Sequence, residues 1–295
     1  MSADFMNMLQ NMAPRSNRSL QDLTDSNDKL SGMDAMELRG FASQSPMVPS
    51  RDLTDELGRS LMSTLQGRSN ALKEYVENFD GDRAALVQEL YKKRWGPTRI
   101  PLYNVILTFL HLMADNKDFI LETTRYLAQE LSVPVDGTDV TGGSALYWAI
   151  STKPFAQAEF AQMLFDAGGS VNQKNRFSAT TASEIAQVDF TTDTKKNVQM
   201  MEWYVEHGGD VEGKDSDGMN VKMLVEMMRK RVPGMEQVVK KGKGPRKEGE
   251  CANCGRKPSE KVFSACARCR GVRYCSQECQ KVDWKSHKKS CKAAA

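Results

Sequence analysis

Seven cysteines and one histidine near the end of the sequence have the residue types and spacing of metal ligands. All seven cysteines lie between Cys251 and Cys291, and the first 250 residues have none. With the histidine they form two Cys-x2-Cys pairs, one Cys-x3-Cys pair and one His-x3-Cys pair. Zinc takes four tetrahedral nitrogen or sulfur ligands, so eight ligands predict two closed structural sites without an open position for a catalytic water. The expected ligands are Cys251, Cys254, Cys266, Cys269, Cys275, Cys279, His287 and Cys291.

This use of cysteine also indicates a redox environment. A disulfide-stabilised secreted protein would rarely gather an odd number of cysteines into one short segment, so zinc binding in a reducing compartment explains the pattern better. We therefore expect the protein in the nucleus, the cytoplasm or both. The longest apolar run, 100–114, is interrupted by Asn104 and His111, and the first ten residues lack the basic start of a secretory signal. No membrane contact is expected.

The segment around these ligands resembles the MYND family of zinc fingers. The resemblance rests on the ligand spacing and on the stretches Gly255-Arg-Lys257, Arg273-Tyr-Cys-Ser276 and Asp283-Trp284. It implies interleaved sites, whereas the spacing alone leaves sequential pairing open. A segment of about 45 residues cannot build enough apolar core to fold alone, so each zinc is expected to supply about 10–16 kcal/mol. The implied ligand sets are Cys251, Cys254, Cys275 and Cys279 for one zinc, and Cys266, Cys269, His287 and Cys291 for the other.

MYND fingers characteristically bind short proline-containing peptides with a Pro-x-Leu-x-Pro-like core, beside the hairpin and the C-terminal helix. The resemblance carries this role to the strand from Val272 to Tyr274. It also carries it to Gln280, which can hydrogen-bond a peptide backbone, and to Trp284, which can form an apolar wall. The alternative for Trp284 is that it fills the small core of the finger. Ala267 stands where the family often has a contact residue, so part of the polar contact set is expected to be missing.

An internal repeat lies upstream of the finger. Units start at Asp139, Asn175 and Asp215, and the first two end in a Gly-Gly pair. These units resemble ankyrin repeats, in which a hairpin turn precedes an inner and an outer helix, and Gly142 and Gly218 suit the tight turn. The starts are 36 and 40 residues apart, whereas ankyrin repeats span about 33, so the repeats are degenerate. The alternative is an irregular helical bundle.

We predict a mainly α fold, an ankyrin-like helical repeat array followed by a small two-zinc, cross-braced finger. Residues 1–50 are polar and lack periodicity, so disorder is expected there, and residues 51–138 are helical with a candidate degenerate N-terminal repeat. The repeats occupy 139–229. Residues 230–249, rich in glycine and lysine, are expected to be a flexible basic linker, and 250–295 are the finger.

Charge is unevenly divided along the chain. Residues 229–295 carry 19 Lys+Arg against 6 Asp+Glu, a formal +13, whereas residues 1–228 carry 22 against 32, a formal −10. Such asymmetry suggests separate partners for the two parts. The basic part could bind nucleic acid through phosphates, but the finger offers no recognition helix with base-reading residues. Nucleic acid is therefore the alternative partner, and protein is the expected one.

We expect no enzyme activity. Neither His111 nor His207 begins the His-x-Asp/Glu pattern of an iron site, every cysteine is assigned to zinc, and the sequence lacks P-loop, nucleophile-elbow and dinucleotide motifs. The expected function is an adaptor. Its repeat loops 138–143, 174–179 and 214–219 would bind one protein, and its finger would capture a second by a proline-containing peptide, with a transcriptional or chromatin complex as a candidate setting. A purely structural finger that docks back onto the repeats is the remaining alternative.

Overall fold

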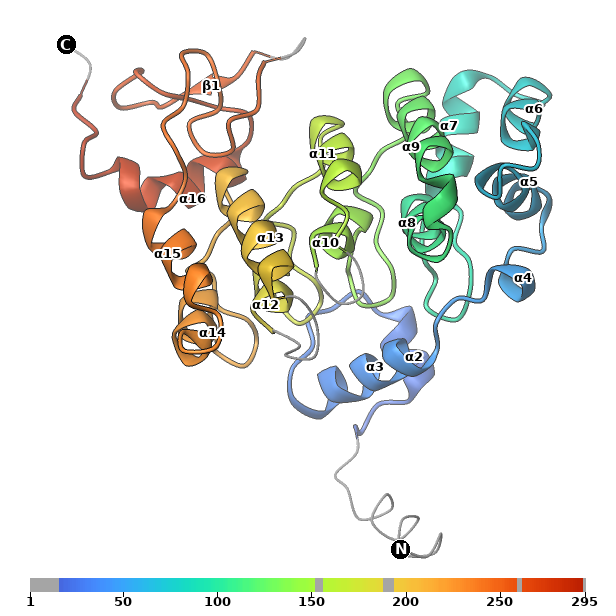
Figure 1. The fold of residues 1–295 in the computed structure, drawn as a ribbon, viewed down its shortest axis with the longest axis horizontal. Helices are drawn as coiled ribbons and strands as arrows, with labels where there is room; N and C mark the ends of the chain where they lie inside the picture. Colours follow the sequence, from blue (N-terminus) through green and yellow to red (C-terminus); the bar gives the residue numbers. More distant parts are fainter. Residues whose placement is uncertain (1–15, 152–155, 188–193, 259–261, 294–295) are drawn as a thin grey trace, which may run out of the picture.

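The computed structural model describes residues 16–151, 156–187, 194–258 and 262–293. Helices form a curved row across the molecule, with a two-stranded hairpin and the C-terminal helix at one end (Figure 1). The expected mainly α class is confirmed. Within the described ranges, every helix falls short of the length and apolar character that crossing a bilayer requires.

Residues 49–130 form the N-terminal end of the row. α5 and α7 begin at aspartates, because the carboxylates of Asp55 and Asp82 accept hydrogen bonds from amides of the first helical turn. α8 is buried along most of its length, and α9 packs against it. The elements are α4 (Pro49–Asp52), α5 (Glu56–Leu65), α6 (Ala71–Glu77), α7 (Arg83–Lys92), α8 (Leu102–Leu112), η1 (Ala114–Asn116), α9 (Lys117–Arg125) and η2 (Tyr126–Glu130).

Three helix pairs continue the row, and the residues that start the three units have one common role. Side-chain oxygens of Asp139, Asn175 and Asp215 each accept hydrogen bonds from the amides two and four residues further on. Gly142 and Gly218 follow at φ of +82° and +81°, the left-handed turn conformation that glycine allows. The ankyrin-like arrangement is confirmed. The pairs are α10 (Ala145–Ile150) with α11 (Ala158–Asp166), α12 (Thr181–Ala186) with α13 (Lys195–Glu206), and α14 (Val221–Met228) with α15 (Pro233–Lys241).

α15 lies in the segment that we expected to be a flexible linker, 230–249. The structure instead gives the third repeat its outer helix there, with a proline in the first turn and α13 packed against it. Met235 is fully buried, and Val238 and Val239 pack against the same core. The apolar spacing of these three residues is a helical signal, which the surrounding glycines and lysines obscured.

The N-terminal segment also differs from the expected disorder. Residues 1–15 lie outside the described residues, but α2 (Leu20–Asp25) and α3 (Gly32–Gln44) cross the hairpins of the repeats (Figure 1). Apolar residues of the two helices and of the segment between them form a small core with two hairpin residues, so local composition alone could not reveal this order. Loops 138–143 and 174–179, expected as contact surfaces, are therefore partly covered by the chain itself. The core consists of Leu23, Leu30, Ala35, Leu38, Val140 and Phe177.

Arg176 fastens this N-terminal segment to the repeats. Its side chain is only 7% exposed, and its guanidinium donates hydrogen bonds to the Leu23 carbonyl at 2.7 Å and the Ser26 hydroxyl at 2.7 Å. It also donates to the carbonyl oxygens of Asp28 at 3.0 Å and Val140 at 2.9 Å. One buried side chain thus links α2 and the chain after it to two neighbouring hairpins.

Candidate metal centre and the groove beside it

The finger, residues 250–295, brings the eight expected ligands into two groups of four. Within each group the ligand atoms all lie within 4.8 Å of one another. The interleaved pairing implied by the resemblance is confirmed, and the sequential pairing is not what the chain forms. One group is Cys251, Cys254, Cys275 and Cys279, and the other is Cys266, Cys269, His287 and Cys291.

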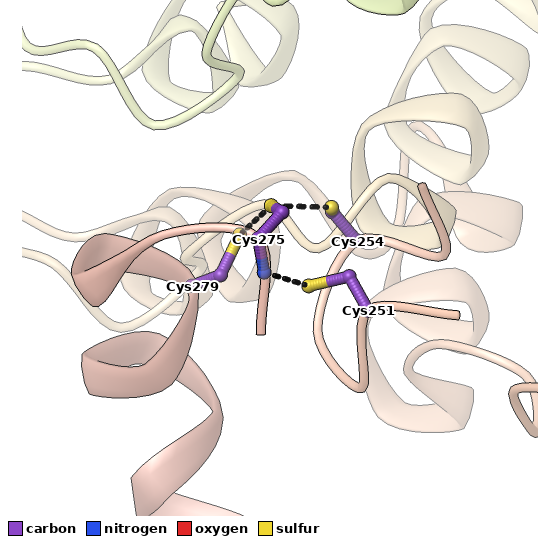
Figure 2. A group of neighbouring side chains, drawn as sticks. All are labelled: Cys251, Cys254, Cys275 and Cys279. Carbon is purple, nitrogen blue, oxygen red and sulfur yellow. Dashed lines mark hydrogen bonds between the residues drawn. The ribbon is translucent and has the colours of Figure 1, made fainter. Parts of the chain in front are cut away.

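The distances within each group fit a zinc ion. Figure 2 shows the Cys275 sulfur facing the sulfurs of Cys254 and Cys279, each at 3.5 Å. In the second group the Cys269 sulfur lies 3.4 Å from Nε2 of His287. Zn–S bonds of about 2.3 Å in a tetrahedron place neighbouring sulfurs about 3.8 Å apart, and sulfur and nitrogen slightly closer. Both groups therefore have the donor set and the size of a structural zinc site, and two zinc ions are the cofactors that they suit.

Local backbone elements orient these ligands. β1 (Ser264–Ala265) pairs antiparallel with β2 (Arg273–Tyr274), which places the Cys-x2-Cys pair at Cys266 beside the strand that leads into Cys275. The Cys275 amide donates to the Cys251 sulfur at 3.4 Å. α16 (Gln277–His287) begins at Ser276, whose hydroxyl accepts a hydrogen bond from the Cys279 amide at 3.1 Å. The same cap that starts the helix therefore fixes the backbone of one ligand.

Tyr274 fills the small core of the finger. Its side chain is 1% exposed, and its hydroxyl donates to Oδ2 of Asp283 at 2.7 Å. Burial and this acceptor raise the pKa of Tyr274. The other Asp283 oxygen accepts from Lys243 Nζ at 2.6 Å. Tyr274 was expected at the peptide-binding strand, and in the structure its side chain faces the core.

An open groove of about 470 Å³ lies between the hairpin side of the finger and α16. Trp284 forms part of its wall with 39% of its surface exposed, and its ring meets the His287 ring edge-on at 5.9 Å between centroids. Gln280 lines the same groove, so the structure brings together two of the four expected peptide-contact residues. The lining residues are Cys266, Ala267, Arg268, Gln277, Gln280, Lys281 and Trp284.

The other two expected contact residues lie outside the groove lining. The Val272 carbonyl accepts a hydrogen bond from the Cys266 amide at 2.9 Å within the hairpin. The other edge of β2 is also occupied, because the Ala252 amide donates to the Arg273 carbonyl at 2.8 Å. Neither edge of β2 is therefore open for an added peptide strand.

The finger is docked against the repeats, as one of the sequence alternatives held, through polar contacts that sequence reasoning did not identify. Arg256 Nη2 donates to the carbonyls of Phe165 at 2.6 Å and Gly169 at 3.0 Å. The same guanidinium lies 4.3 Å from the centroid of the Phe165 ring. Lys285 Nζ adds an ion pair with Asp210 at 3.0 Å. The finger thus docks on the ends of the outer helices α11 and α13.

The segment between α15 and the finger takes part in this docking. Lys243 Nζ donates to the Ala252 carbonyl at 2.9 Å, besides its contact with Asp283. Arg246 Nη2 donates to the carbonyl of Asn253 at 2.8 Å and to that of Glu206 at the end of α13. In sequence these residues are indistinguishable from solvent-facing bases of a linker, because the backbone and carboxylate oxygens that accept from them are brought near only by the fold.

The loop after α13 lies directly under the finger. Gly208 has a φ of +77°, and its carbonyl accepts from Asn253 Nδ2 at 2.9 Å. A Cβ at Gly208 would lie 2.5 Å from that same nitrogen, so only glycine allows this approach. His207 stacks on Trp203 with centroids 3.8 Å apart, and its Nε2 lies 2.9 Å from Oε1 of Gln162. Burial lowers the pKa of His207.

Comparison with known proteins identifies a family for the finger segment. Residues 251–291 match the family model described as MYND finger. The segment is 48% identical over 46 residues to SET domain-containing protein 14 of Caenorhabditis elegans, a match to 16% of this chain and 10% of that protein. It is 52% identical over 44 residues to ubiquitin carboxyl-terminal hydrolase 19 of Arabidopsis thaliana, 15% of this chain and 6% of that protein. The match thus spans only a small part of these curated relatives.

Among solved structures, an ankyrin repeat domain from Acinetobacter baumannii AYE is similar to this chain with a TM-score of 0.45 and 18% identity. The similarity covers 70% of this chain and 91% of that one.

Proposed function

We propose that this protein is a non-enzymatic adaptor, whose zinc-dependent finger binds a short proline-containing peptide and whose repeats bind a second protein. MYND fingers and ankyrin repeats generally mediate protein–protein binding. The observation that carries the proposal is the exposed groove in which Gln280 and Trp284 lie together. Each zinc group is complete with four protein ligands, so neither leaves a coordination position for a reacting water.

The chemistry of the groove suits a proline-containing peptide. Proline segments adopt the extended polyproline conformation at little entropic cost, and their rings pack on aromatic side chains such as Trp284. Proline lacks an amide hydrogen but keeps its carbonyl, which the amide group of Gln280 can hydrogen-bond. Arg268 and Lys281 at the groove also favour a peptide that carries acidic residues beside its prolines.

The docking contacts favour a peptide over nucleic acid as the ligand. Lys243, Arg246, Arg256 and Lys285 are engaged with acceptors on the repeats or within the finger, so part of the formal positive charge is not presented to phosphates. The finger docks on the repeats through Arg256 and Lys285, and Trp284 in the groove nevertheless stays 39% exposed. We propose a nuclear or cytoplasmic location, because zinc-binding thiolates persist in reducing compartments, and a transcriptional or chromatin complex as the assembly.

The test is the affinity of the full, zinc-loaded chain for a fluorescent peptide with a Pro-x-Leu-x-Pro core, followed by anisotropy. Gln280→Ala and Trp284→Ala should each weaken binding about tenfold or more, which corresponds to about 1.4 kcal/mol of lost contact. Lys289→Ala, an exposed change just beyond α16, should bind as the parent does. Every variant must retain two bound zinc ions per chain, one for each ligand group.

Two results would refute this proposal. One is a peptide affinity that is unchanged in both groove variants. The other is a failure to bind peptide combined with binding to duplex DNA that weakens steeply with salt, the signature of phosphate contacts.

A further inference from the structure

A second cleft, of about 950 Å³, lies on the inner side of the repeats, formed without the finger. Its floor consists of the inner helices α8, α10, α12 and α14, and the hairpin tips form one side. Arg39, Ala42 and Ser43 of α3, with Pro46 and Met47 after it, form the other wall. The cleft is therefore formed jointly by the repeats and by the N-terminal segment of the same chain. The sequence predicted disorder for that segment.

The charged side chains of this cleft are mainly acidic. Among the residues that the structure describes, its lining includes four carboxylates and one cation, Arg39. Asp139 and Asp215 hold the hairpin turns, Asp217 lies at a hairpin tip, and Glu184 lies on α12, where the Tyr147 hydroxyl donates to it at 3.3 Å. Between the carboxylates lie apolar surfaces of Leu107, Trp148, Phe177, Met219 and Leu224.

Arg39 shows how the cleft holds a cation. Its guanidinium carbon lies 4.3 Å from the centroid of the Phe177 ring, and Nη1 lies 3.8 Å from Oδ2 of Asp217. Aromatic face and carboxylate together form a site for a cationic side chain. The Arg39 side chain is nevertheless 43% exposed, and its one carboxylate contact is long. The hold is therefore weak, and among the described lining residues the carboxylates still outnumber the cation.

The dimensions of the cleft indicate an extended ligand. Four helices packed side by side at about 8–10 Å span about 24–30 Å, which an extended peptide of about eight residues would cover. The volume lies at the upper end of small-molecule sites, but it is spread over four helices rather than gathered into one hollow. Alternating side chains of an extended strand could face the apolar floor and the carboxylates in turn.

We propose that this cleft binds an extended segment of a partner protein in which arginine or lysine alternates with apolar residues. The inference rests on the proposed adaptor function and gives the chemistry of its second site. Charge complementarity carries the choice of partner, because nucleic acids and acidic peptides would meet the like charge of Glu184 and Asp217.

The experiment is selection of random nine-residue peptides on the full, zinc-loaded chain, followed by affinity measurement with a synthetic peptide of each enriched class. Basic–apolar peptides should be recovered, and their affinity should fall about tenfold or more in the double variant Glu184→Gln/Asp217→Asn. Asp118→Asn/Glu159→Gln removes the same charge from a separate acidic surface, where both residues line one pocket, and should leave binding unchanged. Met219→Lys, which adds a cation to the cleft, is a second test that removes no carboxylate and should also weaken binding.

The outcomes separate this inference from the finger proposal. Proline-containing peptides that depend on Gln280 and Trp284 report on the finger, and basic–apolar peptides that depend on Glu184 and Asp217 report on the cleft. Absence of the basic–apolar class overturns the cleft inference even when the proline class is recovered. It is also overturned when basic–apolar peptides bind the cleft variants and the charge-matched control equally well.

Discussion

Replacing Arg256 by alanine should uncouple the finger from the repeats without removing its zinc. Arg256 donates two hydrogen bonds to backbone carbonyls, at 2.6 and 3.0 Å, and its guanidinium stacks on Phe165. A charged hydrogen bond contributes about 1.5–3 kcal/mol and a cation–π contact about 0.5–2 kcal/mol, from which ordering the long side chain subtracts up to about 2 kcal/mol. Since the side chain is only half-buried, we expect about 3 kcal/mol of coupling.

The assay is a thermodynamic cycle of urea unfolding, followed by far-ultraviolet circular dichroism, with zinc present and after strong chelation. Chelation should unfold the finger and leave the repeats helical but less stable, because their docked neighbour is lost. Zinc raises the free energy of unfolding of the repeats, and in Arg256→Ala this increase should be about 3 kcal/mol smaller than in the parent chain. In thermal unfolding with zinc, the same change corresponds to a decrease of about 6–12 °C.

Lys257→Ala is the matched control, because this neighbouring residue is exposed and basic. It should behave as the parent chain does with and without zinc. The reasoning is refuted if Arg256→Ala lowers stability equally in both conditions, since the side chain would then act within the repeats or the unfolded state and not across the interface. It also fails if zinc removal leaves the stability of the parent repeats unchanged.

Three further changes test other parts of the fold. Gly208→Ala should lower the free energy of unfolding by at least about 2 kcal/mol in urea titrations, because the new Cβ meets Asn253; Gly168→Ala, also at positive φ but with open space around it, should cost only the backbone strain of about 1–2 kcal/mol. Burial lowers the pKa of His207, so the native state binds fewer protons than the unfolded chain and stability should fall as the pH decreases below about 6.5, by at most about 1.4 kcal/mol per pH unit. His207→Gln should reduce that slope in zinc-saturated protein between about pH 7.5 and 5.5, and an unchanged slope would contradict the assignment. Arg176→Met should release α2 and α3, with amide exchange there about 100-fold faster, because about 3 kcal/mol of buried hydrogen bonding is lost; unaltered exchange would show that the apolar core holds the segment alone.

The zinc ligands and the repeat starts could be predicted because each leaves a pattern within a short stretch of chain. Ligand types at fixed spacing identify the finger whatever surrounds it. Asp139, Asn175 and Asp215 recur because the same turn needs the same acceptor each time. Ser144 in the first unit also caps α10, since its hydroxyl accepts from the Tyr147 amide at 3.2 Å.

Contacts between distant segments left no such pattern. The core under α2 and α3 depends on Val140 and Phe177, which lie far along the chain, so the local sequence is too polar to predict order. Lys243 and Arg246 were expected to be solvated because a basic run with glycine and proline is typical of a linker, yet they donate to backbone and carboxylate oxygens of α13 and the finger. For α15 a local signal existed in Met235, Val238 and Val239, and charge outweighed it in the sequence reasoning.

The ordered connection between α15 and the finger has a consequence for how two ligands can be held at once. A flexible tether would let the two sites search for epitopes at any separation, whereas the clamp formed by Lys243, Arg246 and Arg256 sets one distance and one orientation between the groove and the cleft. If both proposed sites bind their ligands, this fixed geometry makes the protein selective for the spacing between the two motifs. A single partner that carries both motifs gains avidity only if the spacer between them matches that distance. Binding would therefore discriminate between partners by the length of this spacer.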